Sequence, residues 1–171
     1  MGLKASLSTL LVAVLLLCGC GPSGNSGKNA QSGPQLSLED ERAISQVLIR
    51  YATGIDKRDW QLFATCFTKD VQSEYVGIGK WDSRDALVER MEKGHEKIGP
   101  TMHKLTNFVI TGSGDHATAT SYIDALLMPL DAGGTVRPAN GRYEDELVKE
   151  KDGWKISKRR FIPVQILDTL Q

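Results

Sequence analysis

Residues 101–128 read TMHKLTNFVITGSGDHATATSYIDALLM, and this stretch decides the fold class. Segments 101–111 and 117–128 are rich in Thr, Val, Ile and Tyr, and Gly-Ser-Gly-Asp separates them, which is typical of two strands joined by a short turn. Two more segments of the same kind follow at 141–151 and 154–162, separated by Lys-Asp-Gly. Together the four segments predict a run of long antiparallel strands.

Helical periodicity dominates the chain before these strands. Apolar residues recur at helical spacing between Leu38 and Thr53, and Gly54 is expected to end this helix. Asp59 and Ser83 are candidate N-caps of two shorter helices, and a strand is expected at 71–76 between them. Helices followed by an antiparallel sheet predict an α+β fold with three helices packed on one face of the sheet.

The strand at 101–111 carries apolar residues in both of its alternating sets. Leu105 and Val109 fall on one face, and Phe108 and Ile110 fall on the other. Helices can cover only one of these faces. A second subunit is the simplest cover for the other face, so the sequence predicts a homodimer.

The N-terminus has the layout of a bacterial export signal. An apolar run at residues 10–17 follows the single charge of Lys4, and it is too short to span a bilayer as a helix. The residues that follow, Leu17-Cys18-Gly19-Cys20, resemble the bacterial lipobox, which implies lipidation of Cys20 as the mature N-terminus. Modification of Cys18, an ordinary cleaved signal and an uncleaved anchor remain the alternatives.

Four regions follow from this layout: a signal peptide at 1–19, a lipidated cysteine and tether at 20–36, a domain at 37–163 and a tail at 164–171. The tether has no large apolar residue and cannot bury a core of its own. Gly21 follows the cysteine, which implies the periplasmic side of the outer membrane if the host is Gram-negative. We therefore expect an exported, lipid-anchored protein.

Composition excludes several classes of function. The 171 residues include 21 basic and 21 acidic residues, so nothing suggests a nucleic-acid partner. The basic cluster at 155–160 is interpreted as solvated surface.

Once Cys18 is removed and Cys20 acylated, Cys66 is the only thiol, so no internal disulfide is expected. Because no metal-ligand spacing and no phosphate-binding loop occur, neither a metal nor a cofactor is predicted.

Asp56 and His103 are the candidate catalytic pair. Asp56 is expected just past the first helix, where a carboxylate is a plausible base, and His103 is expected on a strand face shared with Leu105 and Asn107. Alternatively, Asp56 is a turn residue and His103 is structural. The other two histidines, at positions 95 and 116, are interpreted as exposed.

Aromatic and polar residues around this pair are candidates for contacting an apolar or aromatic small molecule. Each aromatic residue could equally belong to the core. Asp145 is expected on the pocket face, directed toward Arg160, although a plain ion pair between strands is an alternative reading. The predicted ligand-contacting residues are Tyr51, Trp60, Phe63, Tyr75, Asn107, Ile123, Tyr143 and Asp145.

Three segments carry a family resemblance: YATGIDKRDW at 51–60 with FTKD at 67–70, TMHKLTN at 101–107, and GRYEDEL at 141–147 with its continuation to 161. Over residues 36–161 the chain resembles the SnoaL-like branch of the nuclear transport factor 2-like superfamily. The resemblance implies a cone, in which a curved antiparallel sheet wraps against three helices around a deep pocket. The superfamily includes dehydratases, isomerases and cyclases, and also members that only bind ligands or partners.

The scytalone dehydratase branch is the most informative comparison within this resemblance. Asp56 and His103 match its catalytic aspartate and one catalytic histidine, and Tyr75 falls near one of its active-site tyrosines. Ile123 stands near its second histidine, and Ile55 replaces the tyrosine before its aspartate. The resemblance therefore leaves two hypotheses open: a cofactor-independent lyase or isomerase acting on a mainly apolar small molecule, and a non-catalytic lipoprotein that binds a ligand or partner.

Overall fold

A computed structural model describes residues 35–164 of the chain. The expected signal peptide, Cys20 as the expected lipidation site and nearly all of the expected tether lie outside the described residues, as does the tail after Val164. Within 35–164, no helix is long and apolar enough to cross a membrane.

The first helix, α1 (Leu38–Lys57), begins where the sequence predicts, because Ser37 accepts a hydrogen bond from the backbone of Asp40. It runs past Gly54 and ends at Arg58, which has a left-handed φ of 56°. The expected end at Gly54 is therefore wrong. A Cβ on Gly54 would lie 2.9 Å from the backbone nitrogen of Phe63 in the next helix. This glycine therefore lets the two helices approach closely and does not end the first one.

Two shorter helices follow, and their N-caps are the predicted ones. Asp59 caps α2 (Trp60–Ala64) and Ser83 caps α3 (Arg84–His95), each by accepting a hydrogen bond from a backbone N–H three residues later. α2 is short because Phe67 already begins the first strand.

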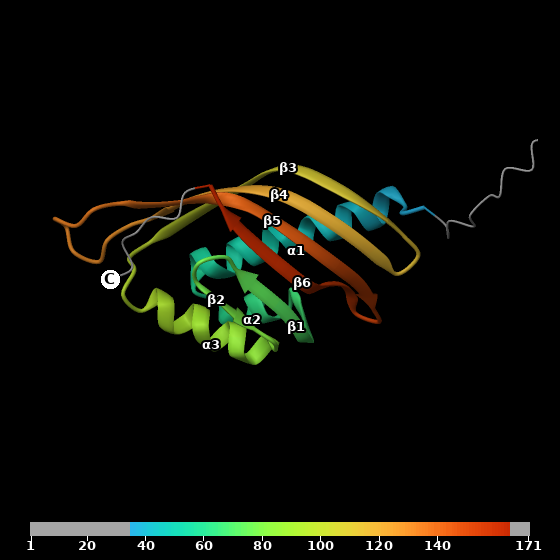
Figure 1. Ribbon diagram of the computed structural model, residues 1–171, viewed down its shortest axis with the longest axis horizontal. Helices are drawn as coiled ribbons and strands as arrows, with labels where there is room; N and C mark the ends of the chain where they lie inside the picture. The colour runs from blue at the N-terminus through green and yellow to red at the C-terminus, as the bar shows by residue number, and fades with distance from the viewer. Residues whose placement is uncertain (1–34, 165–171) are drawn as a thin grey trace, which may run out of the picture. The chain divides into compact units, whose positions relative to one another are not determined.

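Six strands form one sheet in the order β2-β1-β6-β5-β4-β3 (Figure 1). The four strands expected after residue 100 are present and antiparallel to one another, as predicted. The first strand is longer than expected and pairs in parallel with β6, and the short β2 was missed by the sequence analysis. The bounds are β1 Phe67–Tyr75, β2 Gly79–Trp81, β3 Thr101–Ser113, β4 His116–Leu127, β5 Arg137–Glu150 and β6 Gly153–Pro163.

The sheet curves around α1, and the three helices lie on its inner side (Figure 1). Alternate residues of β4 and β5 are buried, as expected for strands with one face against a core and the other toward solvent. α1 contributes a row of buried apolar residues to this core. The predicted α+β fold class, with a curved sheet packed against N-terminal helices, is confirmed.

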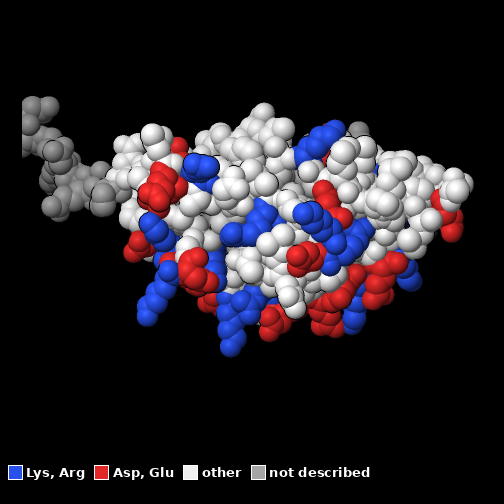
Figure 2. Space-filling view, turned by 180° about the vertical axis from the view of Figure 1, so that it is seen from behind, with Lys and Arg blue, Asp and Glu red and all other residues white. Residues whose placement is uncertain are grey.

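Charged side chains lie mainly outside this core and pair with residues of opposite sign. Arg160, for example, contacts both Glu74 and Glu144 across three neighbouring strands. Figure 2 shows basic and acidic side chains interspersed on one face, without a broad area of one sign. Such a surface does not supply the basic stripe with which proteins typically bind nucleic acid.

Candidate functional site

The strand register arranges the inner face of the sheet in rows that run across the strands. Neighbouring rows are two residues apart, about 7 Å along a strand. The row at the end of the sheet nearest the C-termini of α1 and α3 contains His103, Ala125 and Ala139. Deeper rows contain, in order, first Leu105, Ile123, Gly141 and Pro163, then Ser121, Tyr143, Phe161 and Tyr75, and finally Ala119, Asp145, Arg159 and Ser73.

Asp56 and His103 are in direct contact at the outermost row. The Nδ1 atom of His103 lies 2.6 Å from Oδ1 of Asp56, and the backbone N–H of His103 donates to Oδ2 at 2.9 Å. The hydroxyl of Thr101 donates a third hydrogen bond, to Oδ1, at 2.8 Å. Asp56 lies in the last turn of α1 and not just past the helix, as the sequence analysis expected.

These contacts assign the two ring nitrogens of His103 to different tasks. A carboxylate can only accept, so Nδ1 carries the hydrogen, and in the neutral imidazole Nε2 has the lone pair. Nε2 has no hydrogen-bond partner among residues 35–164 and is not one of the buried polar atoms that lack a partner. The side chain of His103 is 9 % exposed and that of Asp56 is 25 % exposed, so the pair can be reached from outside.

Arg58 fastens this end of α1 to the start of β3. Its guanidinium donates to the carbonyls of Ile55 and Gly99 at 2.7 and 2.6 Å and to the hydroxyl of Thr101 at 2.9 Å. Burial lowers the pKa of Arg58, and the nearby carboxylate of Asp56 opposes that shift. Arg58 was not predicted from the sequence, although a basic side chain directly after the predicted helix was a usable signal.

His95 also lies at this end, where the sequence analysis expected an exposed residue. It is half-buried at the C-terminal end of α3, its ring packs on Trp60 with centroids 5.6 Å apart, and its Nδ1 lies 2.7 Å from the carbonyl oxygen of Met91. The expectation failed because the polar sequence around His95 hides the fact that α3 packs this side chain inward against α2. His116 is exposed, as predicted.

Three tyrosine hydroxyls meet two rows deeper. The hydroxyl of Tyr51 lies 3.0 Å from those of both Tyr75 and Tyr143. Burial raises the pKa of Tyr75 and of Tyr143 well above the ordinary value, so both keep their protons. The three hydroxyl groups have three protons, and the two hydrogen bonds that join them use two of these protons. One hydroxyl proton can therefore be donated to another group. The three residues, expected as ligand contacts, are brought together but are almost fully buried.

A buried ion pair lies against the tyrosines, and its arginine is not the expected one. Asp145 accepts two hydrogen bonds of 2.7 Å from Arg159, and both side chains are 0 % exposed. The guanidinium lies over the rings of Tyr51 and Tyr143, at 3.9 and 4.1 Å. The predicted partner Arg160 points to the outer face, and Arg159 does not belong to the solvated surface.

A bulge in β3 removes Asn107 from the face of His103. The register shifts between Thr106 and Val109, and Asn107 has a left-handed φ of 53°. Asn107 is exposed, so it does not share a buried face with His103, and the uninterrupted alternation expected for this strand is wrong. Val109 is 61 % exposed, whereas Leu105 is half-buried. The remaining predicted contacts lie in or against the core: Phe63 and Ile123 are buried, and Trp60 is partly buried.

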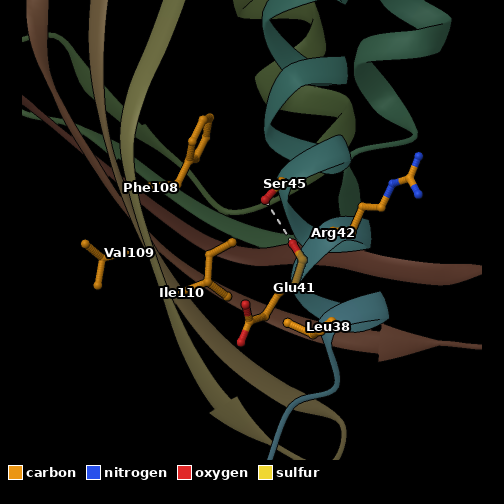
Figure 3. Close-up of a pocket in the computed structure, with 7 residues that line it drawn as sticks. All are labelled: Leu38, Glu41, Arg42, Ser45, Phe108, Val109 and Ile110. Carbon is orange, nitrogen blue, oxygen red and sulfur yellow. Dashed lines mark hydrogen bonds between the residues drawn. The ribbon is translucent and has the colours of Figure 1, made fainter.

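Two surface hollows lie away from the Asp56–His103 pair. The larger, of about 520 Å³, lies between the N-terminal half of α1 and β3 and is drawn in Figure 3. There Phe108 and Ile110 point from β3 toward the helix, and Val109 points away. The second, of about 400 Å³, lies over the turn between β3 and β4 and the adjacent part of β5. Neither hollow is lined by the tyrosines or by the Asp56–His103 pair.

The donor sets of the described residues offer no evident metal centre. Among residues 35–164, no group of three or more His, Cys, Asp or Glu side chains is placed to hold an ion. Cys66 is a buried free thiol, and burial raises its pKa, which makes it a poor nucleophile.

Known proteins resemble this chain in sequence and in fold. A SnoaL-like domain matches residues 36–160. An uncharacterized protein of Mycobacterium tuberculosis strain ATCC 25618 / H37Rv is 28 % identical over 125 residues, which cover 71 % of this chain and 84 % of that protein.

Solved structures agree with this match. A protein of Novosphingobium aromaticivorans provisionally described as a scytalone dehydratase superimposes with a TM-score of 0.70 at 22 % identity, over 75 % of this chain and 86 % of the other. A second protein from that organism, provisionally described as an aromatic ring hydroxylase, gives a TM-score of 0.71 at 26 % identity, over 77 % and 94 %. With the match over residues 36–160, the curved sheet and the three helices, these likenesses show that the chain belongs to the SnoaL-like domain family, within the nuclear transport factor 2-like fold.

Proposed function

We propose that the domain binds a mainly apolar small molecule and catalyses a cofactor-independent proton transfer on it, as a lyase or isomerase. The observation that carries the proposal is the contact between His103 and Asp56, because it leaves Nε2 of the imidazole available at an accessible position. Imidazole is the side chain best suited to exchanging protons near neutral pH. One of the related structures is provisionally described as a dehydratase, which agrees with this class of reaction.

Within this proposal, His103 carries the proton and Asp56 positions it. Asp56 already accepts three hydrogen bonds from protein donors, so it is less free to take a proton from a ligand than Nε2 of His103. The carboxylate fixes the ring orientation and stabilises the imidazolium that forms when Nε2 takes a proton. The geometry therefore favours His103 as the base and Asp56 as the residue that positions it.

The tyrosine hydroxyls would hold an oxygen of the ligand at the inner end. Four residues along β5 separate Ala139, in the row of His103, from Tyr143, which corresponds to about 13 Å. A protonated hydroxyl with a hydrogen to donate can stabilise negative charge that develops on a carbonyl oxygen when the adjacent carbon loses a proton.

Binding without catalysis is the second candidate function, and the burial of the three tyrosines favours it. Their rings pack against one another, Phe161 and the Arg159 guanidinium, so a ligand reaching them must first displace part of this packing. In this alternative the Asp56–His103 pair contributes a polar contact at the rim, and no proton is transferred.

Hydrogen–deuterium exchange at the α-carbon of 2-tetralone, an apolar bicyclic ketone, separates the two functions. If the proposal holds, the protein accelerates exchange, and His103→Asn reduces the rate about 100-fold or more. The Asn side chain retains a donor at the position of Nδ1 for Asp56 and removes Nε2, so folding and orientation are preserved. Perturbation of the His103 resonances by 2-tetralone without exchange would indicate binding alone, and the absence of both effects would refute an apolar-ketone site.

Anchoring of this domain at a membrane is also part of the proposal. It is supported by the apolar run and Leu17-Cys18-Gly19-Cys20 in the sequence. Gln35, the first described residue, pairs with Ser113 at the turn between β3 and β4. That turn is ten residues, about 33 Å, along β3 from His103. An anchored domain would thus be tethered at the end opposite the Asp56–His103 pair, which would leave the pair facing away from the lipid.

A homodimer is proposed from the outer face of β3 and β4, where Val109 and Tyr122 are exposed. The bulge places Val109 on this outer face, whereas Phe108 and Ile110 point toward α1. Sedimentation velocity of protein beginning at Leu36 should show a dimer at micromolar concentration, and Val109→Glu should dissociate it. A monomeric wild-type protein would refute this assembly.

A further inference from the structure

Arg58 occupies a backbone position that favours glycine. It ends α1 with a φ of 56°, in the left-handed region where a Cβ is strained and where helices commonly end on glycine. A residue with a side chain persists in such a conformation when its surroundings hold it there. The guanidinium of Arg58 supplies such contacts, because it binds the carbonyl of Gly99 at 2.6 Å in the segment between α3 and β3. The reason for an arginine at this position therefore lies in its side chain.

The guanidinium begins a chain of hydrogen bonds that ends at His103. Nη1 of Arg58 donates to the hydroxyl oxygen of Thr101 at 2.9 Å, and that hydroxyl donates to Oδ1 of Asp56 at 2.8 Å. Nδ1 of His103 lies 2.6 Å from the same carboxylate oxygen. A guanidinium can only donate, so the oxygen of Thr101 accepts and its single proton is directed at Asp56. Arg58 thus fixes the direction of the hydrogen bond that Asp56 receives.

This chain determines how strongly the charge of Asp56 acts on His103. Oδ1 accepts from Thr101 and from the ring of His103, and Oδ2 accepts from the backbone of His103, so several donors share the negative charge. Arg58 acts on the same carboxylate, since the charge of Asp56 raises the pKa of Arg58 against the effect of burial, and such coupling is reciprocal. A carboxylate favours the protonated form of a neighbouring imidazole. Donors and a cation that withdraw its charge weaken that preference.

The ionisable groups around His103 come from separate elements. The end of α1 contributes Asp56 and Arg58, and α3 contributes His95, whose charge interacts with that of His103. The positions in the same row on β4 and β5 are alanines, and Lys104 on β3 is exposed and pairs with a carboxylate of β4. Burial lowers the pKa of His95 below the ordinary imidazole value. Near neutral pH, Arg58 is therefore the cation that balances Asp56.

We propose that Arg58 and Thr101 are positioning residues that keep His103 neutral and ready to act as the base. The inference rests on the proposed function, in which Nε2 of His103 takes a proton, and deepens it to the control of that step. Through Thr101, Arg58 holds Oδ1 of Asp56 toward Nδ1, so the hydrogen stays on Nδ1 and the lone pair on Nε2. By sharing the charge of Asp56, the two residues also keep the carboxylate from stabilising a protonated ring before a ligand arrives.

An NMR titration of the His103 ring in the full-length protein tests this control of charge. Arg58→Gly preserves the end of α1, because glycine is preferred at a left-handed helix end, and removes only the guanidinium. The titration midpoint of His103 should then move about 0.5–1 pH unit higher, because the cation and the orientation of Thr101 are lost. Thr101→Val should move the midpoint in the same direction by a smaller amount, and Thr101→Ser should restore it.

The sign of the shift separates positioning from a merely structural role. If Arg58 only fastened α1 to β3, its loss would loosen the contact between Asp56 and His103, and the midpoint would fall. Arg58→Lys keeps the charge without the forked geometry, so its midpoint should lie between those of Arg58→Gly and the wild type. Asn107→Gly is the matched control, because Asn107 also has a left-handed φ, is exposed and lies on the strand of His103. It should leave the midpoint unchanged.

The second measurement is the α-carbon exchange of 2-tetralone as a function of pH. In Arg58→Gly the limb of the profile that follows His103 should move to higher pH by the amount of the NMR shift, and the rate above this limb should not fall. A midpoint that stays or falls in both Arg58→Gly and Thr101→Val would overturn the inference and leave the proposed function standing. The absence of wild-type exchange would overturn the proposed function, and the titration alone would then decide whether these residues set the charge of His103. If Arg58→Gly unfolds, the comparison of Thr101→Val with Thr101→Ser decides.

Discussion

Replacing Asp145 by Asn tests whether the buried ion pair with Arg159 is as tightly coupled as its geometry indicates. Both side chains are 0 % exposed, and two hydrogen bonds of 2.7 Å join them. Asn keeps the shape and removes the charge, so the guanidinium stays buried without its counter-ion. Removing one partner of such a pair costs about 3–5 kcal/mol. The free energy of unfolding of a whole domain is about 5–15 kcal/mol, so this loss is a large part of it.

Urea unfolding monitored by tryptophan fluorescence measures this loss. With an m-value of about 2 kcal/mol/M, the midpoint for Asp145→Asn should fall by about 2 M while m stays unchanged. The double variant Arg159→Met with Asp145→Leu removes both charges and should recover most of the loss. Glu146→Gln, in the exposed pair with Lys158, is the matched surface control and should cost less than about 1 kcal/mol. A loss below about 1 kcal/mol for Asp145→Asn, or a double variant no more stable than the single one, would refute the reasoning.

Three further predictions concern other parts of the chain. Hydrogen bonds, chiefly the one from Lys149, hold the pKa of Asp40 below its usual range, so the stability that ionised Asp40 gives the fold is present above about pH 4 and is lost as the pH falls. The difference in Tm between wild type and Asp40→Asn should shrink below about pH 4. A difference that stays constant with pH would contradict this. Asn107→Val, at a φ of 53°, should cost about 1–2 kcal/mol in urea unfolding, whereas Asn107→Gly should cost almost nothing. Cys20→Ser should release the protein from the membrane fraction and remove the acyl mass from its N-terminal peptide, and unchanged fractionation and mass would disprove lipidation.

Local signals in the sequence were sufficient for the elements and the fold class. The caps at Ser37, Asp59 and Ser83 depend on one side chain and a backbone N–H three residues away, so they can be identified without the rest of the fold. The strands from residue 101 onward carry their own periodicity, and the order and spacing of the three segments that carry the resemblance indicated the family. Asp56 and His103 were named as a pair through that resemblance, although 47 residues separate them.

The tertiary structure decided which residues those elements bring together. A bulge at Thr106–Val109 inserts one extra residue into β3 and turns Asn107 away. A register shift between Glu146 and Leu147 interrupts the pairing of β5 with β6 near Arg159. A shift of one residue reverses the face of every side chain that follows, so a sequence pattern alone could not choose between Arg159 and Arg160. In the sequence, Gly54 is typical of a helix end and His95 is typical of a surface residue. In the structure, α2 packs on Gly54 and Trp60 packs on His95, and neither contact can be deduced from the local sequence. Periodicity is a property of neighbours in the chain, whereas burial and partnership depend on register and packing between elements that are distant in sequence.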